Sequence, residues 1–256
     1  MKIQTPPSIA IIGSGRVASA IGVLFRSKGV AITSVYSRNE NSGKHLAANL
    51  DSIFISSIKE SIADIFLICV NDDEIKGVVE QIPLHQKILY TAGSLELETL
   101  NRSKCGVFYP LQTFKDTTQN LENDFPILIE AKDEGLMKDI ISLCKHSGLH
   151  YEKCSSERRK QYHLVAVILN NFVNHLVYLS QEEAHIRGLN WDTLQPLLEK
   201  TCASILQKEA KENQTGPARR GDRKTLKKHE QMLNERNKEI YQKLSQSILN
   251  TYKDEL

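Results

Sequence analysis

The chain has 256 residues, which is long enough for one large domain or two modest ones. Its formal net charge of +2 at pH 7 gives no electrostatic basis for a dedicated nucleic-acid binder or a protein of membrane surfaces. No run in the sequence approaches the roughly 18 consecutive apolar residues that a membrane span needs. Composition therefore indicates a globular protein, with neither nucleic acid nor a membrane as partner.

The cysteines are odd in number, scattered and without CxxC spacing, which is typical of free thiols in a reducing compartment. We therefore expect neither a disulfide framework nor a bound metal. The chain ends in KDEL, a retention signal of the endoplasmic reticulum. However, the apolar stretch near the N-terminus is only about five residues long, too short for a signal peptide. These features predict a cytoplasmic protein.

The first predicted strand, 8–13, runs into the pattern G-x-G-x-x-A, and a helical pattern follows it. This is the context that a dinucleotide-binding turn requires, although an ordinary strand-to-helix connection is the alternative. Gly13 would allow the tight turn and Gly15 would let the backbone approach a pyrophosphate, while the helix N-terminus offers amides. The turn residues assigned to the cofactor are Gly13, Ser14, Gly15, Arg16 and Val17.

The second predicted strand, 31–36, ends in Ser37, Arg38 and Asn39. Folds that bind NAD commonly carry an acid here, which hydrogen-bonds the adenine ribose and repels a 2′-phosphate. The hydroxyl, guanidinium and amide found instead suit a phosphate. The residues therefore predict NADP in preference to NAD, unless Arg38 is only a solvated arginine at a strand end.

Further strands are predicted at 52–55, 64–70, 87–91, 106–109, 125–130 and 149–154, with a helix at 133–147. Apolar strands separated by helices predict a parallel sheet covered on both faces. We therefore predict an α/β fold in which residues 1–154 form a Rossmann dinucleotide-binding domain.

Ligands of open α/β sheets bind at the carboxyl ends of the strands. These ends carry Val70, Asn71, Gly93 and Ser94 as candidate cofactor contacts and Tyr109 as a candidate substrate contact. Turn chemistry and a helix cap explain Gly93 and Ser94 equally well. Asn71 and Glu74 also have the spacing of a capping box, which would begin the helix after the fourth strand.

After residue 154 the strand signals end and helical stretches follow, at 156–188, 191–212 and about 222–253. The first contains YHLVAVILNNFVNHLVYL, which is apolar on nearly every side. Such a helix is buried inside a domain or against another subunit, and the remaining helices are too few and too polar to enclose it. We therefore predict an all-α domain at 155–256 and a homodimer that shares the helix 156–188.

His163, Asn170 and Asn174 fall within about 40° on this helix, at roughly 100° per residue. In a cleft, His163 would donate a proton and Asn170 would orient a carbonyl or imine, with Asn174 as a candidate substrate contact. Alternatively, the three satisfy one another in a helical core or a dimer interface. Lys160, one turn earlier, is a further catalytic candidate, with a solvated surface lysine as its alternative.

The segment TGPARRGD (215–222) precedes a run of basic residues. If this loop folds over the site, Arg219 or Arg220 would grip an anionic substrate. Alternatively the loop is a structural turn held by Arg–Asp hydrogen bonds, with Asp222 as the cap of the next helix. A nucleic-acid patch is disfavoured because acids interrupt the basic run and no aromatics interleave with it.

Several motifs in this order resemble the Rossmann-like NADP oxidoreductase-type proteins that carry a carboxyl-terminal helical domain of unknown function. Their distant relatives are pyrroline-5-carboxylate reductase and the deazaflavin-dependent NADP oxidoreductases. The motifs are IIGSGRVA, CVNDDEI, TAGS, YPLQTF, YHLVAVILNNF and TGPARRGD. The resemblance implies an NADP-binding domain, a helical dimerisation domain and a site at the cleft between them. The chain departs from it at Tyr109, where several family members have histidine; tyrosine donates a hydrogen bond but does not titrate near neutral pH.

Together these features predict an NADP-dependent oxidoreductase that transfers a hydride between NADP(H) and a small carbonyl or imine compound in the interdomain cleft. The alternative is a non-catalytic NADP-binding dimer that senses redox state or binds a partner protein, because the sequence lacks a complete acid–base signature. A structural module associated with nucleic acid is a third hypothesis, which the near-neutral charge disfavours.

Overall fold

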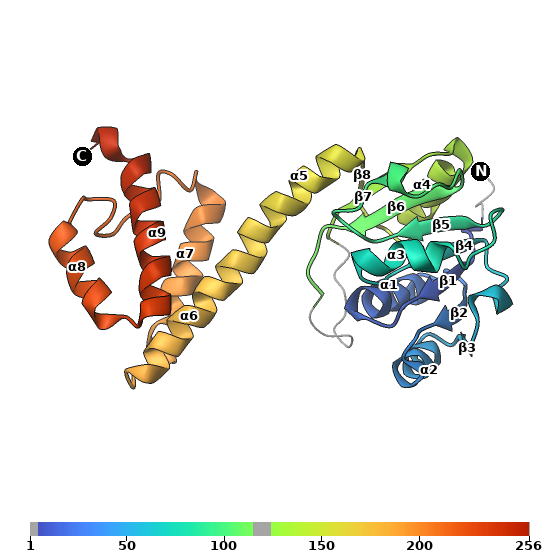
Figure 1. The fold of residues 1–256 in the computed structure, drawn as a ribbon, viewed down its shortest axis with the longest axis horizontal. Coiled ribbons are helices and arrows are strands. Elements are labelled where there is room, and N and C mark those ends of the chain that lie inside the picture. Colours follow the sequence, from blue (N-terminus) through green and yellow to red (C-terminus); the bar gives the residue numbers. More distant parts are fainter. Residues whose placement is uncertain (1–4, 115–123, 256) are drawn as a thin grey trace. The chain divides into compact units, whose positions relative to one another are not determined.

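The structure, a computed structural model, describes residues 5–114 and 124–255 (Figure 1). The chain falls into two compact units, Met1–Leu169 and Asn170–Leu256. The division lies within the long helix that follows the last strand, whereas the predicted domain boundary lies at the start of that helix. That boundary, between residues 154 and 155, stays a prediction.

The first unit is built on an eight-stranded sheet with the order β3-β2-β1-β4-β5-β6-β7-β8. The strands are β1 (Ile9–Ile12), β2 (Ile32–Tyr36), β3 (Ile53–Ile55), β4 (Ile65–Ile68), β5 (Lys87–Tyr90), β6 (Cys105–Pro110), β7 (Ile127–Ala131) and β8 (Tyr151–Lys153). This is the strand order of the Rossmann fold with an extension at the β6 edge, so the predicted fold class is confirmed.

The sheet differs from the prediction at one pairing, since β6 and β7 are antiparallel while the other neighbours are parallel. An apolar strand pattern carries no information about strand direction. Parallel neighbours require a crossover connection, whereas antiparallel neighbours do not. Residues 111–126 join β6 to β7, and 115–123 lie outside the described part of the chain.

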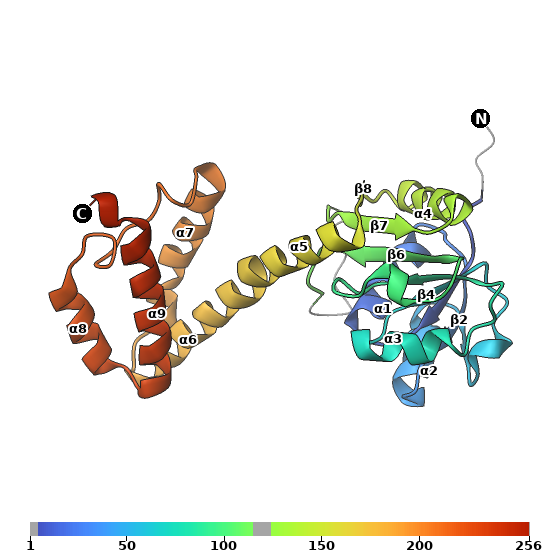
Figure 2. The ribbon, with the colours of Figure 1, turned by 45° about the horizontal axis from the view of Figure 1, so that its top comes forward.

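Helices cover both faces of this sheet, as the sequence predicts. They are α1 (Arg16–Ser27), α2 (Glu40–Asn49), α3 (Asp72–Val79) and α4 (Glu134–His146), with single 3-10 turns at Ile58–Glu60 and Leu97–Thr99. Ile9 and Ile11 of β1 lie in one buried apolar cluster, and the alternate residues Ala10 and Ile12 lie in a second. Helix α1 packs in the first cluster and α3 in the second, while α4 lies along β6 and β7 (Figure 2). The strands are thus buried on both sides, which explains their continuous apolar sequence.

The helix predicted over 156–188 is present but is not a regular α-helix. It begins as α5 (Ser156–Ala166), continues as a π-helical segment (Val167–Phe172) and ends as α6 (Val173–Ile186). A π-helix has more residues per turn than an α-helix. Counting at 100° per residue therefore does not hold between His163 and Asn174, and that count does not establish a shared face for them.

The apolar surface of this helix is largely exposed in the single chain. The exposed side chains include Leu164, Val165, Ile168, Leu169, Phe172 and Val173. Within the described residues, Ser156–Ile186 is also the one helix whose length and mean hydropathy would allow it to cross a membrane. Helices that pack against protein pass the same test, so the absence of a membrane partner stays a prediction.

The second unit contains α6, α7 (Gln195–Gln207), α8 (Arg223–Met232) and α9 (Glu235–Thr251), with 3-10 turns at Trp191–Thr193 and Lys253–Glu255. Its all-helical character is as predicted. The stretch predicted as one helix over 222–253 is two helices, because Asn234 accepts a hydrogen bond of 2.9 Å from the amide of Asn237 and so caps a new one. Asp222 caps α8 through the Thr225 amide at 3.0 Å, as predicted.

Candidate functional site

A cavity of about 910 Å³ opens at the carboxyl ends of β1, β2 and β4, and helix α3 forms its far wall. Most of the residues predicted to contact a cofactor line it: Gly13, Ser14, Gly15, Ser37, Arg38, Asn39, Val70 and Asn71. Two further predicted residues lie beside it, since Arg16 is exposed in the first turn of α1 and Val17 packs against the sheet. The structure thus brings together segments that are far apart in the sequence.

The glycine turn fits a dinucleotide. Gly13 adopts φ of +116°, and a Cβ there would overlap the carbonyl oxygen of Cys69, so this position requires glycine. A Cβ at Gly15 would meet none of the described atoms within 4 Å, so the backbone is open to a close approach. Gly15 is the N-cap of α1; it lacks a side-chain cap, and the first turn carries no acid. The first amides of α1 and the positive end of its dipole therefore suit a pyrophosphate.

Three serine hydroxyls meet near the end of β2, and two of them, those of Ser14 and Ser37, line this cavity. The Oγ atom of Ser14 lies 2.8 Å from that of Ser37 and 2.7 Å from that of Ser42. Asn39 caps α2, because its Oδ1 accepts a 3.1 Å hydrogen bond from the Ser42 amide. The side-chain oxygen of Asn39 is therefore engaged in the helix start. Ser42 was not predicted from the sequence, where the one indication of it is its position three residues after the N-cap Asn39.

Arg38 forms an ion pair with Glu74, a residue of the first turn of α3. Its side chain is 75% exposed, while that of Glu74 is 29% exposed, and both line the cavity. The predicted capping box of α3 is incomplete, because the side chain of Asn71 makes no cap hydrogen bond. The carboxylate of Glu74 contacts Arg38 instead, an interaction that sequence spacing does not reveal.

A second group of predicted residues meets two strands away from β4. Tyr109, at the end of β6, shares a hydrogen bond of 3.0 Å between its hydroxyl and Nδ1 of His163 in α5. Gly93 lies against both rings, because a Cβ there would come within 2.8 Å of His163 Nδ1 and 2.9 Å of Tyr109 Cζ. Close packing against these two side chains therefore requires glycine at position 93. Ser94 donates a hydrogen bond to Asp72, the first residue of α3, and so links the ends of β4 and β5.

Burial raises the pKa of Tyr109; the negative charge of Asp72 adds to this effect and Arg159 opposes it. The phenol is therefore protonated throughout the neutral range. If it donates to Nδ1 of His163, the neutral imidazole carries its proton on Nε2.

Tyr109 lies two strands from the cavity. With a strand spacing of about 4.8 Å, it is roughly 10 Å from the end of β4, which lines the cavity.

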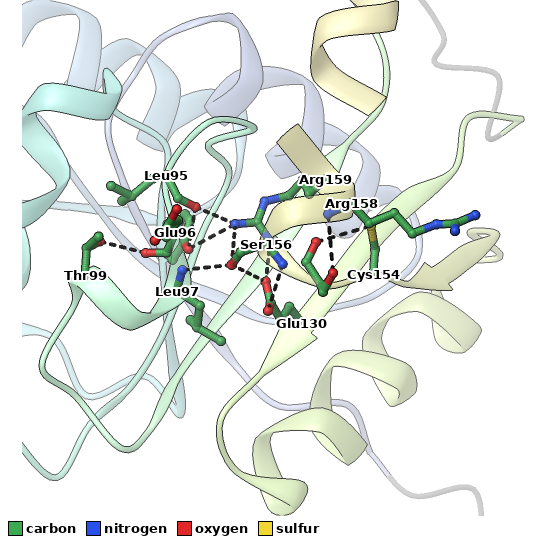
Figure 3. A network of polar contacts seen from close by, with 11 residues as sticks. Leu95, Glu96, Leu97, Thr99, Glu130, Cys154, Ser156, Arg158 and Arg159 are labelled. Atoms are coloured by element: carbon green, nitrogen blue, oxygen red, sulfur yellow. Dashed lines mark hydrogen bonds and ion pairs between the residues drawn. The ribbon is translucent and has the colours of Figure 1, made fainter. Parts of the chain in front are cut away.

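A buried network fixes the start of α5 to the sheet (Figure 3). Arg159 is fully buried, pairs with Glu130 of β7 and donates to the carbonyl oxygen of Leu95. Ser156 donates to Glu130 at 2.7 Å and accepts from the amide of Leu97 at 2.9 Å. Since Arg159 precedes His163 by four residues, the two lie on the same face of α5, and the network orients the face that carries His163.

The other predicted residues have different surroundings. Lys160 pairs with Glu96 in the loop after β5. Arg219 donates to Glu255 at 2.5 Å and lies 4.2 Å from the ring of Tyr252, contacts that favour the structural alternative for this loop. Asn170, Asn174 and Arg220 are exposed in the second unit. The described contacts thus unite Tyr109 with His163, and the roles assigned to the second unit stay predictions.

Two family models match the chain. Residues 8–91 match the family described as NADP oxidoreductase, coenzyme F420-dependent, and residues 125–248 match a domain of unknown function, DUF2520. No match was found among curated proteins.

Solved structures resemble nearly the whole chain. A Bacteroides fragilis protein, described provisionally as an NADP oxidoreductase, is 29% identical, with a TM-score of 0.85 and coverage of 96% of this chain and 99% of that one. A Thermotoga maritima protein shares the fold at 22% identity, with a TM-score of 0.70 and coverage of 96% and 99%. An imine reductase of Myxococcus stipitatus, solved with NADP⁺, shares it at 14% identity, with a TM-score of 0.65 and coverage of 97% and 93%. The chain thus joins an amino-terminal segment of the NADP oxidoreductase type to a carboxyl-terminal DUF2520 segment, and the resemblance inferred from its motifs is confirmed.

Proposed function

We propose that this protein is an NADP-dependent oxidoreductase that transfers a hydride between NADP(H) and a small carbonyl or imine compound. The observation that carries the proposal is the Tyr109–His163 pair, a hydrogen-bonded proton donor at the same strand ends as the cavity that contains the glycine turn. The NADP-type family match and the absence of an acid at the end of β2 support the choice of cofactor. The shared fold of an imine reductase supports the substrate class.

The residues of the chain would manage the proton, while a bound NADPH would supply the hydride. Tyr109 would donate the proton of its hydroxyl to the oxygen or nitrogen atom that is being reduced. In the tautomer whose proton is on Nδ1, His163 would instead donate to the Tyr109 oxygen; the phenolate would then take that proton while Nε2 of the imidazole takes one from water. An imidazole exchanges protons near neutral pH, which a phenol alone does not. The pair therefore accounts for proton transfer at a position where a lone tyrosine would be a slow acid. Lys160 would take no part in this step, because its ammonium pairs with Glu96.

We also infer a homodimer formed through the helix 156–188. Phe172 and Leu169 on this helix are 57% and 70% exposed in the single chain. Burying a side chain of this size contributes about 1.5–3 kcal/mol, so a partner subunit that covers the helix would be bound firmly. Light scattering after gel filtration without detergent tests this inference. A dimeric mass supports it, and a monomer or a detergent-dependent species contradicts it.

The function is tested in two stages. The first is a fluorescence titration of the full chain with NADPH and NADH, in which NADPH should bind more tightly. The second follows NADPH absorbance with a panel of cyclic imines and small ketones, for wild type and Tyr109→Phe. Losing one acid group should slow turnover by about 10²- to 10⁴-fold while NADPH binding stays unchanged.

Three outcomes separate the alternatives. Turnover that depends on Tyr109 supports the oxidoreductase. Tight NADPH binding without turnover of any compound favours the non-catalytic NADP-binding dimer. If neither nucleotide binds, the oxidoreductase proposal is wrong.

A further inference from the structure

We propose that Glu74 of α3 supplies the acidic group that the end of β2 lacks, and that it sets the discrimination between NADPH and NADH by holding Arg38. This inference rests on the proposed function, because it concerns the cofactor of the same site. It assigns a role to a residue that sequence spacing connects only with a helix start.

The inference rests on the charged side chains that line the cavity. Among the described residues that line it, Arg38 is the sole cation and Glu74 the sole anion. The two side chains come from different segments, the turn after β2 and helix α3, and they contact each other directly. Their formal charges cancel where a 2′-phosphate would add about two negative charges. The side chains that line the cavity therefore offer that phosphate no net formal charge while the pair is intact.

The two cofactors place opposite demands on this pair. A 2′-phosphate needs cations and hydrogen-bond donors, so Arg38 has to exchange Glu74 for the phosphate. The carboxylate of Glu74 is then left unpaired beside a second anion. A ribose hydroxyl, in contrast, donates to a carboxylate, so NADH would gain a hydrogen bond from Glu74 and leave Arg38 in place.

The remaining polar groups still favour the phosphate. The hydroxyls of Ser14 and Ser37 line the cavity near Arg38 and can turn to donate to a phosphate oxygen, while Ser42 donates to the carbonyl oxygen of Asn39 at 3.1 Å and contacts Ser14. We infer that these donors and Arg38 create the preference for NADPH, and that Glu74 limits it. Glu74 therefore lowers the preference for NADPH over NADH, so that NADH can still bind.

The test compares Glu74→Gln with wild type, using NADPH, NADH, and the fragments adenosine 2′,5′-bisphosphate and 5′-AMP as calorimetric probes. An exposed ion pair changes an equilibrium constant by up to about fivefold, and loss of the direct repulsion adds to this. We expect NADPH and the bisphosphate to bind more tightly and NADH more weakly. The ratio of the two dinucleotide dissociation constants should change by about tenfold.

Asp73→Asn is the matched control, since it removes one negative charge from the same helix turn. Asp73 is exposed and is not among the described residues that line the cavity, so its variant should leave the ratio within about twofold. Arg38→Ala completes the cycle, because without Arg38 the Glu74→Gln change should improve NADPH binding by less than it does in wild type.

The outcomes distinguish this inference from the proposed function. If wild type binds neither dinucleotide, the proposed function fails and Glu74 has no role in it. If wild type binds NADPH but Glu74→Gln leaves the ratio unchanged or weakens NADPH binding, the role of Glu74 is refuted while the oxidoreductase proposal stands.

Discussion

Replacing Arg159 with methionine tests whether the buried network holds α5 on the sheet. The side chain of Arg159 is 0% exposed and that of Glu130 is 21% exposed. Removing one partner of a buried ion pair costs about 3–5 kcal/mol, because it leaves a charge unpaired away from water. Glu130 would keep two hydrogen bonds from Ser156, of 2.7 Å from the hydroxyl and 3.0 Å from the amide. We therefore expect the lower end of that range, about 3 kcal/mol.

Hydrogen exchange followed by mass spectrometry is the appropriate assay, since it reports on the first unit separately from the second. Peptides that cover β6 and β7 should exchange about a hundredfold faster in Arg159→Met, because 1.36 kcal/mol corresponds to a factor of ten. Arg158→Met provides the same chemical change at the neighbouring position. Arg158 is 62% exposed and lies 3.5 Å from Glu152, so its loss should cost less than about 1 kcal/mol.

Equal exchange rates in the two variants would refute the idea that burial of Arg159 anchors this helix. Arg159→Lys covers the case in which the methionine variant does not fold. Lysine keeps the positive charge but loses the planar fork that reaches Glu130 and Leu95 together. An intermediate exchange rate is therefore expected for it.

Three further predictions address packing, charge and assembly. Gly93→Ala should lower the free energy of unfolding by about 1–3 kcal/mol, because the added methyl group overlaps two rings; an unchanged melting temperature would contradict this. Hydrogen bonds from the hydroxyl and amide of Ser8 lower the pKa of Asp64. The ionised carboxylate of Asp64 therefore stabilises the fold at pH values above its unfolded-state pKa of about 3.9. This contribution is lost as the pH falls through the lower pKa of the folded state. Ser8→Ala should raise the pKa of Asp64 in a carboxyl NMR titration, and an identical titration curve would show that the hydroxyl has no effect. Phe172→Asp should shift the molecular mass in light scattering from dimer to monomer. The control Ile62→Asp, at an apolar side chain that is 88% exposed in the first unit, should leave the mass unchanged. Equal masses for wild type and both variants would count against the helix as the interface.

The local sequence was sufficient for most of the first unit. Strands such as Ile9–Ile12 and Ile65–Ile68 are continuous apolar runs, because the sheet buries both faces and each residue must suit a core. The need for glycine at positions 13 and 15 was also predictable from the sequence, because the turn itself sets the backbone geometry there. The antiparallel pairing of β7 was not predictable, because side-chain pattern is the same in either direction. The break at Asn234 was missed because propensity favours helix on both sides of it.

The partners of the site residues depended on tertiary structure. The sequence placed Tyr109 at a strand end and His163 in a helix, but 54 residues separate them and only the packed fold makes them neighbours. The sequence likewise showed that no acid follows β2 directly. It could not show that Glu74 of helix α3 contacts Arg38. Backbone geometry and burial depend on short stretches of sequence, so the sequence by itself determined the fold class, the glycine turn and the family resemblance. Contacts between charged and hydrogen-bonding side chains depend on which strand ends meet in space, and that only the tertiary structure decided.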